Sequence, residues 1–248
     1  MNDSRLQMVR KLAHDVNGPL GNATAFIDLA LQQFNDVIEK QEKGDASANL
    51  ADLKMGVDFL KLSLPSIVQL QRNMRMWSAL HQMVVEEYGV QLRRLDVSEY
   101  IEKAYEQLST FLIKKNINYH IEGSLKNKLI ADAELLGLIV FYFFDLAVAT
   151  TERNSDVAFH LSEDEKNDEI LIGVSIKMDT DYPNLFNQLA SRFANDINQL
   201  PQVFDHGIVK PLAYGSIFVP TAVEAMGGVF DFSLVDRLLK CEMRFQAN

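Results

Sequence analysis

The sequence has a single cysteine, Cys241, and only six prolines among its 248 residues. One cysteine excludes a disulfide within the chain and any metal site built from several cysteines. Cys241 lies in the run "LLKCEMRF", whose pattern is typical of a strand. We therefore interpret Cys241 as a buried structural thiol.

Basic residues are few, with 24 Lys and Arg against 34 Asp and Glu and a net charge of −10. Nucleic acids and anionic membranes bind basic surfaces, so this charge argues against both as partners. The start, "MNDSRLQMVRK", lacks the apolar core of a signal peptide. The apolar run "LLGLIVFYFF" is about half of the roughly 18 residues that a membrane span needs. We predict a soluble, cytoplasmic protein without membrane insertion. Its input signal is expected to come from another protein or from an omitted part of the gene.

Residues 1–88 have helical periodicity and predict a hairpin of two long helices. One heptad column holds Val9, Val16, Ala23, Ala30 and Val37, and the neighbouring column holds Ala13, Leu20, Ile27 and Phe34. The polar break "EKGDAS" precedes a second helix with a similar apolar stripe. A lone hairpin cannot bury stripes this wide. We therefore expect a homodimer in which two hairpins form a four-helix bundle.

Residues 89–248 predict an α+β domain, and we place the boundary between Gln82 and Leu95. A helix is expected to begin at Asp96 or Ser98, and another covers "AELLGLIVFYFFDLAVATTE". The expected strands are "INYHIEG", "KLIAD", the pair "VAFHLSE" and "EILIGVSIKM", and the hairpin "GVFDFSLV" with "KCEMRFQ". Two more helices are expected over "YPNLFNQLASRFANDINQL" and "FVPTAVEAMGG". Grouped strands with interspersed helices give the α+β class.

The segment "KLAHDVNGPLGNA", residues 11–23, places a histidine, an acid and a proline within one amphipathic helix. His14 falls in the heptad column away from the apolar stripe, so its imidazole is predicted to project into solvent. Asp15 lies about 100° further round the helix. Pro19 cannot donate a hydrogen bond to the carbonyl of Asp15, so we expect a bend just after His14.

The motif "HDVNGPL" resembles the phosphoacceptor box of bacterial sensor histidine kinases, where His, then Glu or Asp, then Pro-Leu have these offsets. A hairpin followed by an α+β domain also resembles their dimerisation and ATP-binding domains. The resemblance implies that His14 carries a phosphoryl group and that the partner is the receiver domain of a response regulator. An exposed imidazole is substantially unprotonated near neutral pH and can attack phosphorus, and Asp15 could orient the ring.

Three residues near His14 are candidate partner-binding positions: Lys11, Asn17 and Gly18. Lys11 lies one turn before His14 and could screen phosphate charge, although a plain solvated lysine is an equal interpretation. In the family, the residue before the proline is commonly threonine or asparagine and orients a water molecule. Gly18 occupies this position without a side chain, which implies weak phosphatase activity.

The second domain departs from the family at its nucleotide motifs. Alignment from Asp132 places Tyr142 and Leu146 where the family has asparagines, one of which helps to hold magnesium. Asp145 is one residue away, about 100° round the helix. The remaining candidate nucleotide contacts are Asp145, Asp179, which lacks the family's following glycines, and Gly215, which matches the last glycine of the glycine-rich stretch.

These observations favour a histidine phosphotransferase of a two-component phosphorelay that exchanges phosphate between His14 and a receiver aspartate. No cofactor is expected. The alternative is an atypical histidine kinase that phosphorylates His14 from ATP and Mg²⁺, and a second alternative is a non-catalytic dimeric scaffold. An unrelated enzyme is the weakest interpretation, because no Ser-His-Asp set or metal cluster is visible and the other histidines are scattered: His81, His120, His160 and His206.

Overall fold

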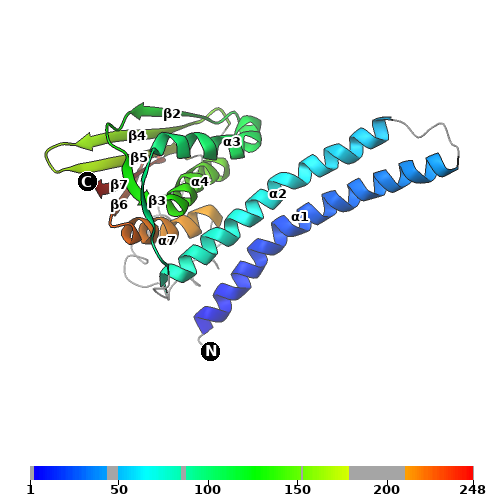
Figure 1. Cartoon of the computed structure of the whole chain (residues 1–248), viewed down its shortest axis with the longest axis horizontal. Coiled ribbons are helices and arrows are strands. Elements are labelled where there is room, and N and C mark those ends of the chain that lie inside the picture. The colour runs from blue at the N-terminus through cyan, green and yellow to red at the C-terminus, as the bar shows by residue number, and fades with distance from the viewer. Residues whose placement is uncertain (1–2, 44–49, 85–87, 152, 179–209, 248) are drawn as a thin grey trace. The chain divides into compact units, whose positions relative to one another are not determined.

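The structure is a computed structural model that describes residues 3–43, 50–84, 88–151, 153–178 and 210–247. The side chains of residues 3–17 lie outside the described part. The chain forms two compact units, Met1–Ser78 and Ala79–Asn248, which we describe separately (Figure 1). The domain boundary at residues 88 and 89 stays a prediction.

The first unit is a helical hairpin, as the heptad pattern predicts. Helix α1 (Asp3–Glu42) is unbroken through Gly18 and Pro19, and α2 (Leu50–Val84) follows it. The two helices pack closely, because the ring of Phe34 lies against Gly56, and the Lys40 ammonium is 3.3 Å from the Asp52 carboxylate. The predicted apolar column faces inward, since its described members are all buried: Ala23, Ala30 and Val37.

The second unit contains a five-stranded sheet in the order β2-β4-β5-β7-β6. Strand β2 (Asn118–Gly123) pairs in parallel with β4 (Asp156–Asp164). The remaining pairs are antiparallel and involve β5 (Glu169–Lys177), β7 (Leu238–Gln246) and β6 (Val229–Val235). A separate two-stranded sheet joins β1 (Leu92–Leu95) to β3 (Leu129–Asp132).

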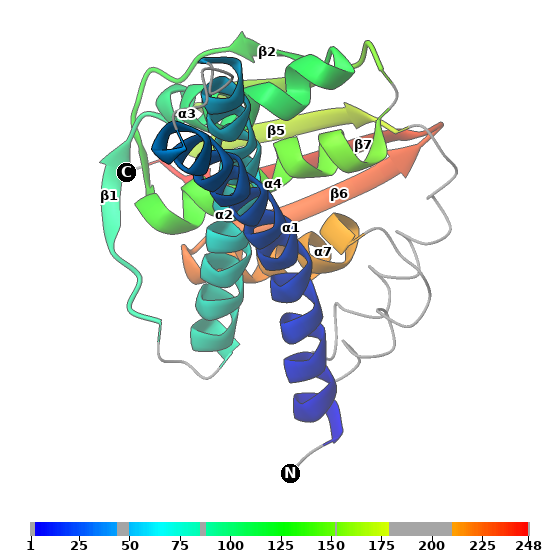
Figure 2. The ribbon, with the colours of Figure 1, turned by 90° about the vertical axis from the view of Figure 1, so that its right-hand side faces the viewer.

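Three described helices lie on one face of the five-stranded sheet: α3 (Val97–Lys115), α4 (Ala133–Thr150) and α7 (Lys210–Ala225) (Figure 2). Alternate residues of β5 and β7 are buried toward this face, among them Ile172, Val174 and Met243. Cys241 is buried with them, as predicted, and burial raises the pKa of its thiol. The opposite face carries the polar residues of each strand. The α+β class predicted from the sequence is confirmed.

Two elements differ from the sequence-based expectation. The short strand β1 was missed, because "LRRL" is charged and only Leu95 of its four residues is buried. Helix α7 begins at Lys210 rather than near Phe218, so it is longer than the apolar pattern alone indicates. The helix expected over residues 182–200 and the residue His206 lie outside the described residues.

Within the described residues, α4 is the one helix that is long and apolar enough to cross a membrane, with a mean hydropathy of 1.8 over 18 residues. The apolar segment is longer than expected from the sequence, because the run "LLGLIVFYFF" includes only its ten most apolar residues. Of this 18-residue window, 67% is buried inside the unit. Packing in the core of a domain therefore accounts for the composition of α4.

Candidate functional site

The segment that carries His14 is helical throughout. Residues 11–23 belong to α1, so the histidine, the acid and the proline lie on one continuous helix. The side chains of Lys11, His14, Asp15 and Asn17 lie outside the described residues. Their positions along the helix, however, follow from the backbone and its 3.6-residue period.

The heptad column of His14 is exposed wherever the structure describes it. Gly21, Asp28 and Asn35, which follow His14 at intervals of seven residues, are all exposed. The apolar column of Val16, about 200° round the helix, is buried at its described members, with Ala30 at 0% exposure. This alternation supports a position for His14 on the outer face of the hairpin.

Gly18, the residue before Pro19, is exposed on α1. A Cβ atom built at this position meets nothing within 4 Å. The surface around Gly18 is therefore open enough to accept a larger side chain.

Helix α4 contains the residues that the sequence alignment placed at the family's metal-binding asparagines. Its N-cap is Asp132, whose carboxylate accepts hydrogen bonds from the Glu134 and Leu135 amides at 2.9 and 3.1 Å. The positions aligned with the family's asparagines, Tyr142 and Leu146, are 4% and 0% exposed. Burial raises the pKa of the Tyr142 phenol well above its usual value, so this group stays neutral. Both side chains pack in the core and offer no oxygen ligand to a magnesium ion.

The other candidate nucleotide contacts are not brought together by the described structure. Asp145 is half-buried on α4, one residue before Leu146. Gly215 lies inside α7 rather than in a loop before it, because the helix begins five residues earlier. Asp179 lies outside the described residues. The residues present therefore do not fit the family's usual set of magnesium and phosphate ligands, and no group of His, Cys, Asp and Glu among the described residues could hold a metal ion.

A polar cluster around Asp132 was missed by the sequence analysis. Asp132 is 5% exposed, accepts a hydrogen bond from the Gln91 amide at 2.8 Å and faces the Tyr88 hydroxyl at 3.4 Å. A hollow of about 310 Å³ opens beside these residues and is also lined by Arg93 and Glu134. The cap itself is visible in the sequence, as an Asp before an apolar helix. Its partners are not, because they lie more than 40 residues away.

A second polar cluster corrects the expectation that the histidines are scattered. On the exposed sheet face, the Glu122 carboxylate contacts His120 Nε2 at 3.1 Å and His160 Nδ1 at 2.8 Å. His160 Nε2 lies 3.0 Å from the Ser175 hydroxyl. Three strands contribute these residues. Only the register of β2, β4 and β5 brings them together.

Comparison with known proteins gives fold neighbours only. Neither a protein-family model nor a curated protein matches the sequence. Among solved structures, the chain is similar to the Acinetobacter baumannii histidine kinase AdeS, with a TM-score of 0.54 and 8% identity over 88% of this chain and 95% of that chain.

Two further structures are less similar. The nucleotide-free catalytic domain of histidine kinase ThkA has a TM-score of 0.49 and 14% identity over 63% of this chain and 96% of that chain. Full-length ShkA, solved with AMPPNP, has a TM-score of 0.47 and 16% identity over 74% of this chain and 38% of that chain.

Identities this low establish a common architecture and leave the chemistry to be argued from the residues. The AdeS match spans the hairpin and the α+β unit in one alignment of most of the chain. The resemblance inferred from "HDVNGPL" and the element order is confirmed at the level of the fold: the chain has the fold of the sensor histidine kinases.

Proposed function

We propose that this protein is a two-component phosphorelay protein that carries a phosphoryl group on His14. In this proposal it is a histidine phosphotransferase, which exchanges phosphate with the aspartate of a response-regulator receiver domain. Asp15 orients the imidazole, and Lys11, Asn17 and Gly18 form part of the docking surface. Catalysis rests mainly on positioning the two reacting groups.

The observation that carries the proposal is the exposed column of α1 in which His14 stands. A receiver domain must bring its phosphorylated aspartate into contact with the imidazole, so the histidine needs an unobstructed face. The exposed residues at Gly21, Asp28 and Asn35 continue that face along the helix. The open space beside Gly18 lies one helical turn after His14.

Burial of Tyr142 and Leu146 favours a transferase over a kinase. Magnesium takes about six oxygen ligands, and neither a core leucine nor a neutral buried phenol supplies one. The charge of −10 also disfavours an uncompensated triphosphate. We expect an ATP dissociation constant above about 1 mM, which corresponds to less than roughly 4 kcal/mol of binding free energy.

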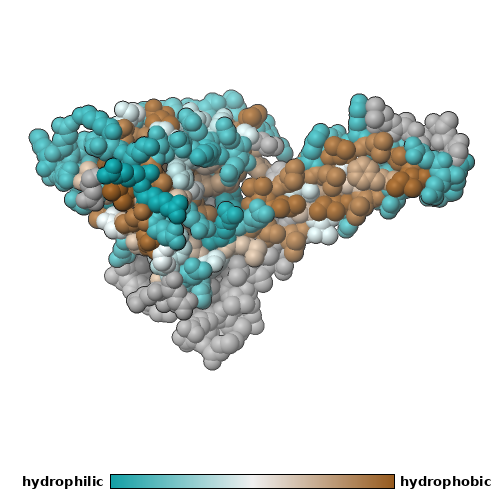
Figure 3. All heavy atoms as spheres, viewed as in Figure 1, coloured by the Kyte–Doolittle hydropathy of each residue, from teal (hydrophilic) through white to brown (hydrophobic). Residues whose placement is uncertain are grey.

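The hairpin surface supports a homodimer as the working form. Exposed apolar side chains follow a helical stripe on each helix, and Figure 3 shows hydrophobic surface along the hairpin. Such a stripe would be covered if two hairpins formed a four-helix bundle. Its most exposed members, at 38–57%, are Leu20, Leu31, Ile38, Leu53, Val57, Leu60, Leu64 and Met74.

The experiment is phosphoryl transfer measured from two donors. The full chain is incubated with a ³²P-labelled receiver domain and, separately, with labelled ATP and Mg²⁺. We expect acid-labile label from the receiver and little or none from ATP. His14→Gln should abolish the labelling, while His81→Gln, which changes another exposed helical histidine, should leave it intact.

Each other outcome contradicts a defined part of the proposal. Acid-labile label on His14 from ATP would establish the atypical kinase instead, with Asp145 or Asp179 as candidate contacts. If neither ATP nor any receiver of a panel labels the protein, the non-catalytic dimeric scaffold is the remaining interpretation. Label that survives His14→Gln would show that the phosphoacceptor is another residue.

A further inference from the structure

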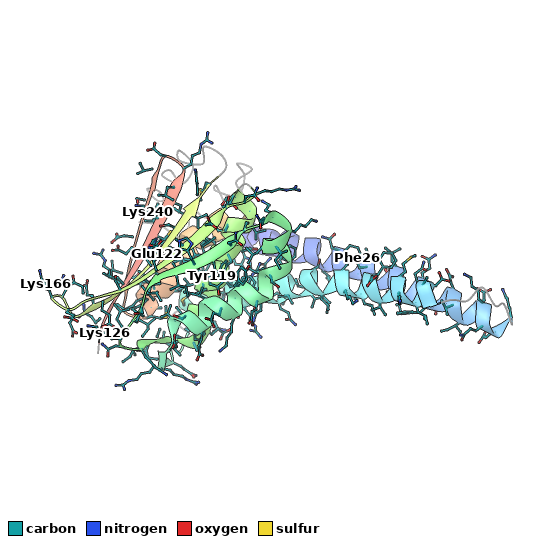
Figure 4. All side chains as sticks on the ribbon, turned by 90° about the horizontal axis from the view of Figure 1, so that it is seen from above. Phe26, Tyr119, Glu122, Lys126, Lys166 and Lys240 are labelled. Carbon is teal, nitrogen blue, oxygen red and sulfur yellow. The ribbon has the colours of Figure 1, made fainter. Side chains whose placement is uncertain are left out.

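The exposed face of the five-stranded sheet carries a chain of hydrogen-bonded side chains that the proposed phosphorelay does not use. His120 and Glu122 are two residues apart on β2, so both point to the same face. Glu122 is directly opposite His160 on β4. Ser175 lies on β5, which pairs with β4. Glu122 and Lys240 are labelled on their strands in Figure 4.

The hydrogen bonds fix the protonation of the His160 ring. An ionised carboxylate only accepts hydrogen bonds, so His160 Nδ1, at 2.8 Å from Glu122, carries the ring proton. In the neutral imidazole Nε2 then has a free lone pair, to which the Ser175 hydroxyl at 3.0 Å can donate. This is the order of groups, carboxylate to imidazole to hydroxyl, that activates a serine as a nucleophile.

Gly173 leaves room for the His160 ring. Gly173 is the cross-strand neighbour of His160, and a Cβ atom there would lie 3.2 Å from His160 Cβ and 3.5 Å from its Cδ2. The imidazole can lie over this position because a side chain is absent. A hollow of about 460 Å³ adjoins it, lined by His160, Gly173, Ser175, Ser233 and Lys240 among others. Its volume is within the roughly 300–1,000 Å³ range of small-molecule sites.

Lys240 places a basic side chain opposite Ser175 on the neighbouring strand. It is directly opposite Ser175 in the pairing of β5 with β7, where facing Cβ atoms are about 4.5–5.5 Å apart. On its other side Lys240 faces Ser233 of β6. A cation next to the nucleophile can stabilise negative charge that develops on an attacked carbonyl oxygen.

From this geometry we propose that Ser175 is a nucleophile for activated carboxylic esters, with His160 as its general base and Glu122 as the positioning residue. In the first step Ser175 Oγ bonds to the acyl carbon and its proton passes to His160 Nε2. The bond from the acyl carbon to the leaving oxygen breaks, and that oxygen takes the proton. In the second step His160 removes a proton from water, and the water oxygen bonds to the acyl carbon. The bond from that carbon to Ser175 Oγ breaks, and Oγ takes the proton from His160, which releases the carboxylic acid.

The exposed position of the Glu122–His160–Ser175 chain sets the size of the expected rate loss. A histidine general base contributes about 10²–10⁴-fold to the rate of such a step. The His160 side chain is 42% exposed, so water screens and competes for its hydrogen bonds. We therefore expect a loss at or below the low end of this range, roughly ten- to a hundredfold, when the base is removed.

The test is covalent labelling of the full chain with a fluorophosphonate, which reacts selectively with activated serines, followed by peptide mass spectrometry. We expect the label on Ser175, and its loss in Ser175→Ala. The matched control is Ser162→Ala, because Ser162 is an exposed serine on β4, two residues from His160, that faces Leu171 and lies outside the lining of the hollow. This control should label at the wild-type rate.

Two variants test whether Ser175 is activated by His160 and Glu122 or is simply a reactive surface serine. His160→Gln should slow labelling by about tenfold or more. Glu122→Gln should also slow it, and the ¹⁵N signals of the His160 ring should show that the Nδ1-protonated form is no longer the sole tautomer. A folded protein without label on Ser175, equal labelling of Ser175 and Ser162, or a rate unchanged by His160→Gln would each overturn the proposal. Circular dichroism of each variant verifies the fold.

Discussion

At the scale of single residues, Asp132 connects two backbone segments through one carboxylate. It caps α4 through the amides of Glu134 and Leu135 and holds the amide of Gln91, which precedes β1. These amides lie in a part-buried environment where water cannot fully replace a lost acceptor. The start of α4 and the path of the chain into β1 therefore depend on the same side chain.

We predict that Asp132→Ala lowers the free energy of unfolding by about 2–4 kcal/mol, because the cap is lost and amides are left without an acceptor. The matched control is Asp96→Ala. Asp96 also caps a helix, α3, but it is exposed and accepts one amide, that of Ser98 at 3.1 Å, so its loss should cost about 1 kcal/mol. Urea unfolding followed by circular dichroism measures both. Equal losses would show that the contact with Gln91 adds nothing.

Tyr88 gives a prediction about pH. Burial, followed by the negative charges of Asp132 and Glu134 and the hydrogen bond to Asp132, raises the pKa of Tyr88 from 10.0 to about 12. Between these pH values the unfolded chain loses the phenolic proton while the native chain keeps it. The native state then binds more protons than the unfolded state, so stability falls as the pH rises through this window.

Alkaline titration by ultraviolet absorbance tests this shift. The difference between the wild-type curve and that of Tyr88→Phe isolates one phenol, because the other six tyrosines occur in both proteins. We expect a midpoint near pH 12. A midpoint near pH 10 would show that Tyr88 is solvated and away from Asp132.

At the scale of elements, helical periodicity predicted which residues of a helix are buried, whereas strand register determines which side chains meet across the sheet. The buried column at Ala23, Ala30 and Val37 follows directly from seven-residue spacing. The parallel pairing of β2 with β4 does not, because α4 separates the two strands and no local pattern specifies the partner. Local pattern likewise does not predict the contacts among Glu122, His160 and Ser175. His120 and Glu122 are neighbours in sequence, but His160 and Ser175 join them only through two strand pairings.

Two glycines of the hairpin provide a paired prediction. At Gly56 an added Cβ would lie 2.6 Å from Phe34 Cε1, so the ring has to move, whereas at Gly21 it meets nothing within 4 Å. Gly21→Ala should stabilise α1 by about 0.5–1 kcal/mol through helix propensity. Gly56→Ala should show less gain or a net loss. Thermal unfolding of the two variants compares them, and an equal gain would mean that the contact between the helices is loose.

At the scale of the whole molecule, we predict that light scattering of the full chain gives twice the mass of one chain. Leu64→Asp places a charge in the proposed bundle stripe and should yield monomers. The matched control is Leu62→Asp. Leu62 and Leu64 have similar exposure, 53% and 57%, but Leu62 lies about 200° round the helix from Leu60, a member of the stripe. Dissociation by both variants, or by neither, would place the interface elsewhere.

The proposed assignment of His14 illustrates what a sequence motif can predict and what it cannot. The spacing of His14, Asp15 and Pro19 indicated the family resemblance, and the fold is consistent with it. The burial of Tyr142 and Leu146 likewise follows from the apolar composition of α4. The polar groups around Asp132 and Glu122 were beyond prediction, since each is assembled from segments that only the tertiary fold brings together.

The order of the strands has a consequence for how the protein is made. Strand β7 lies between β5 and β6, and among the described strands it is the one with which β6 pairs. During translation, residues 238–246 must leave the ribosome before the sheet can extend beyond β5. Until then the buried side of β5, with Ile172 and Val174, lacks its neighbour on one edge. The α+β unit should therefore acquire protease resistance only after synthesis of β7, and nascent chains stopped before residue 238 should be a substrate for chaperones.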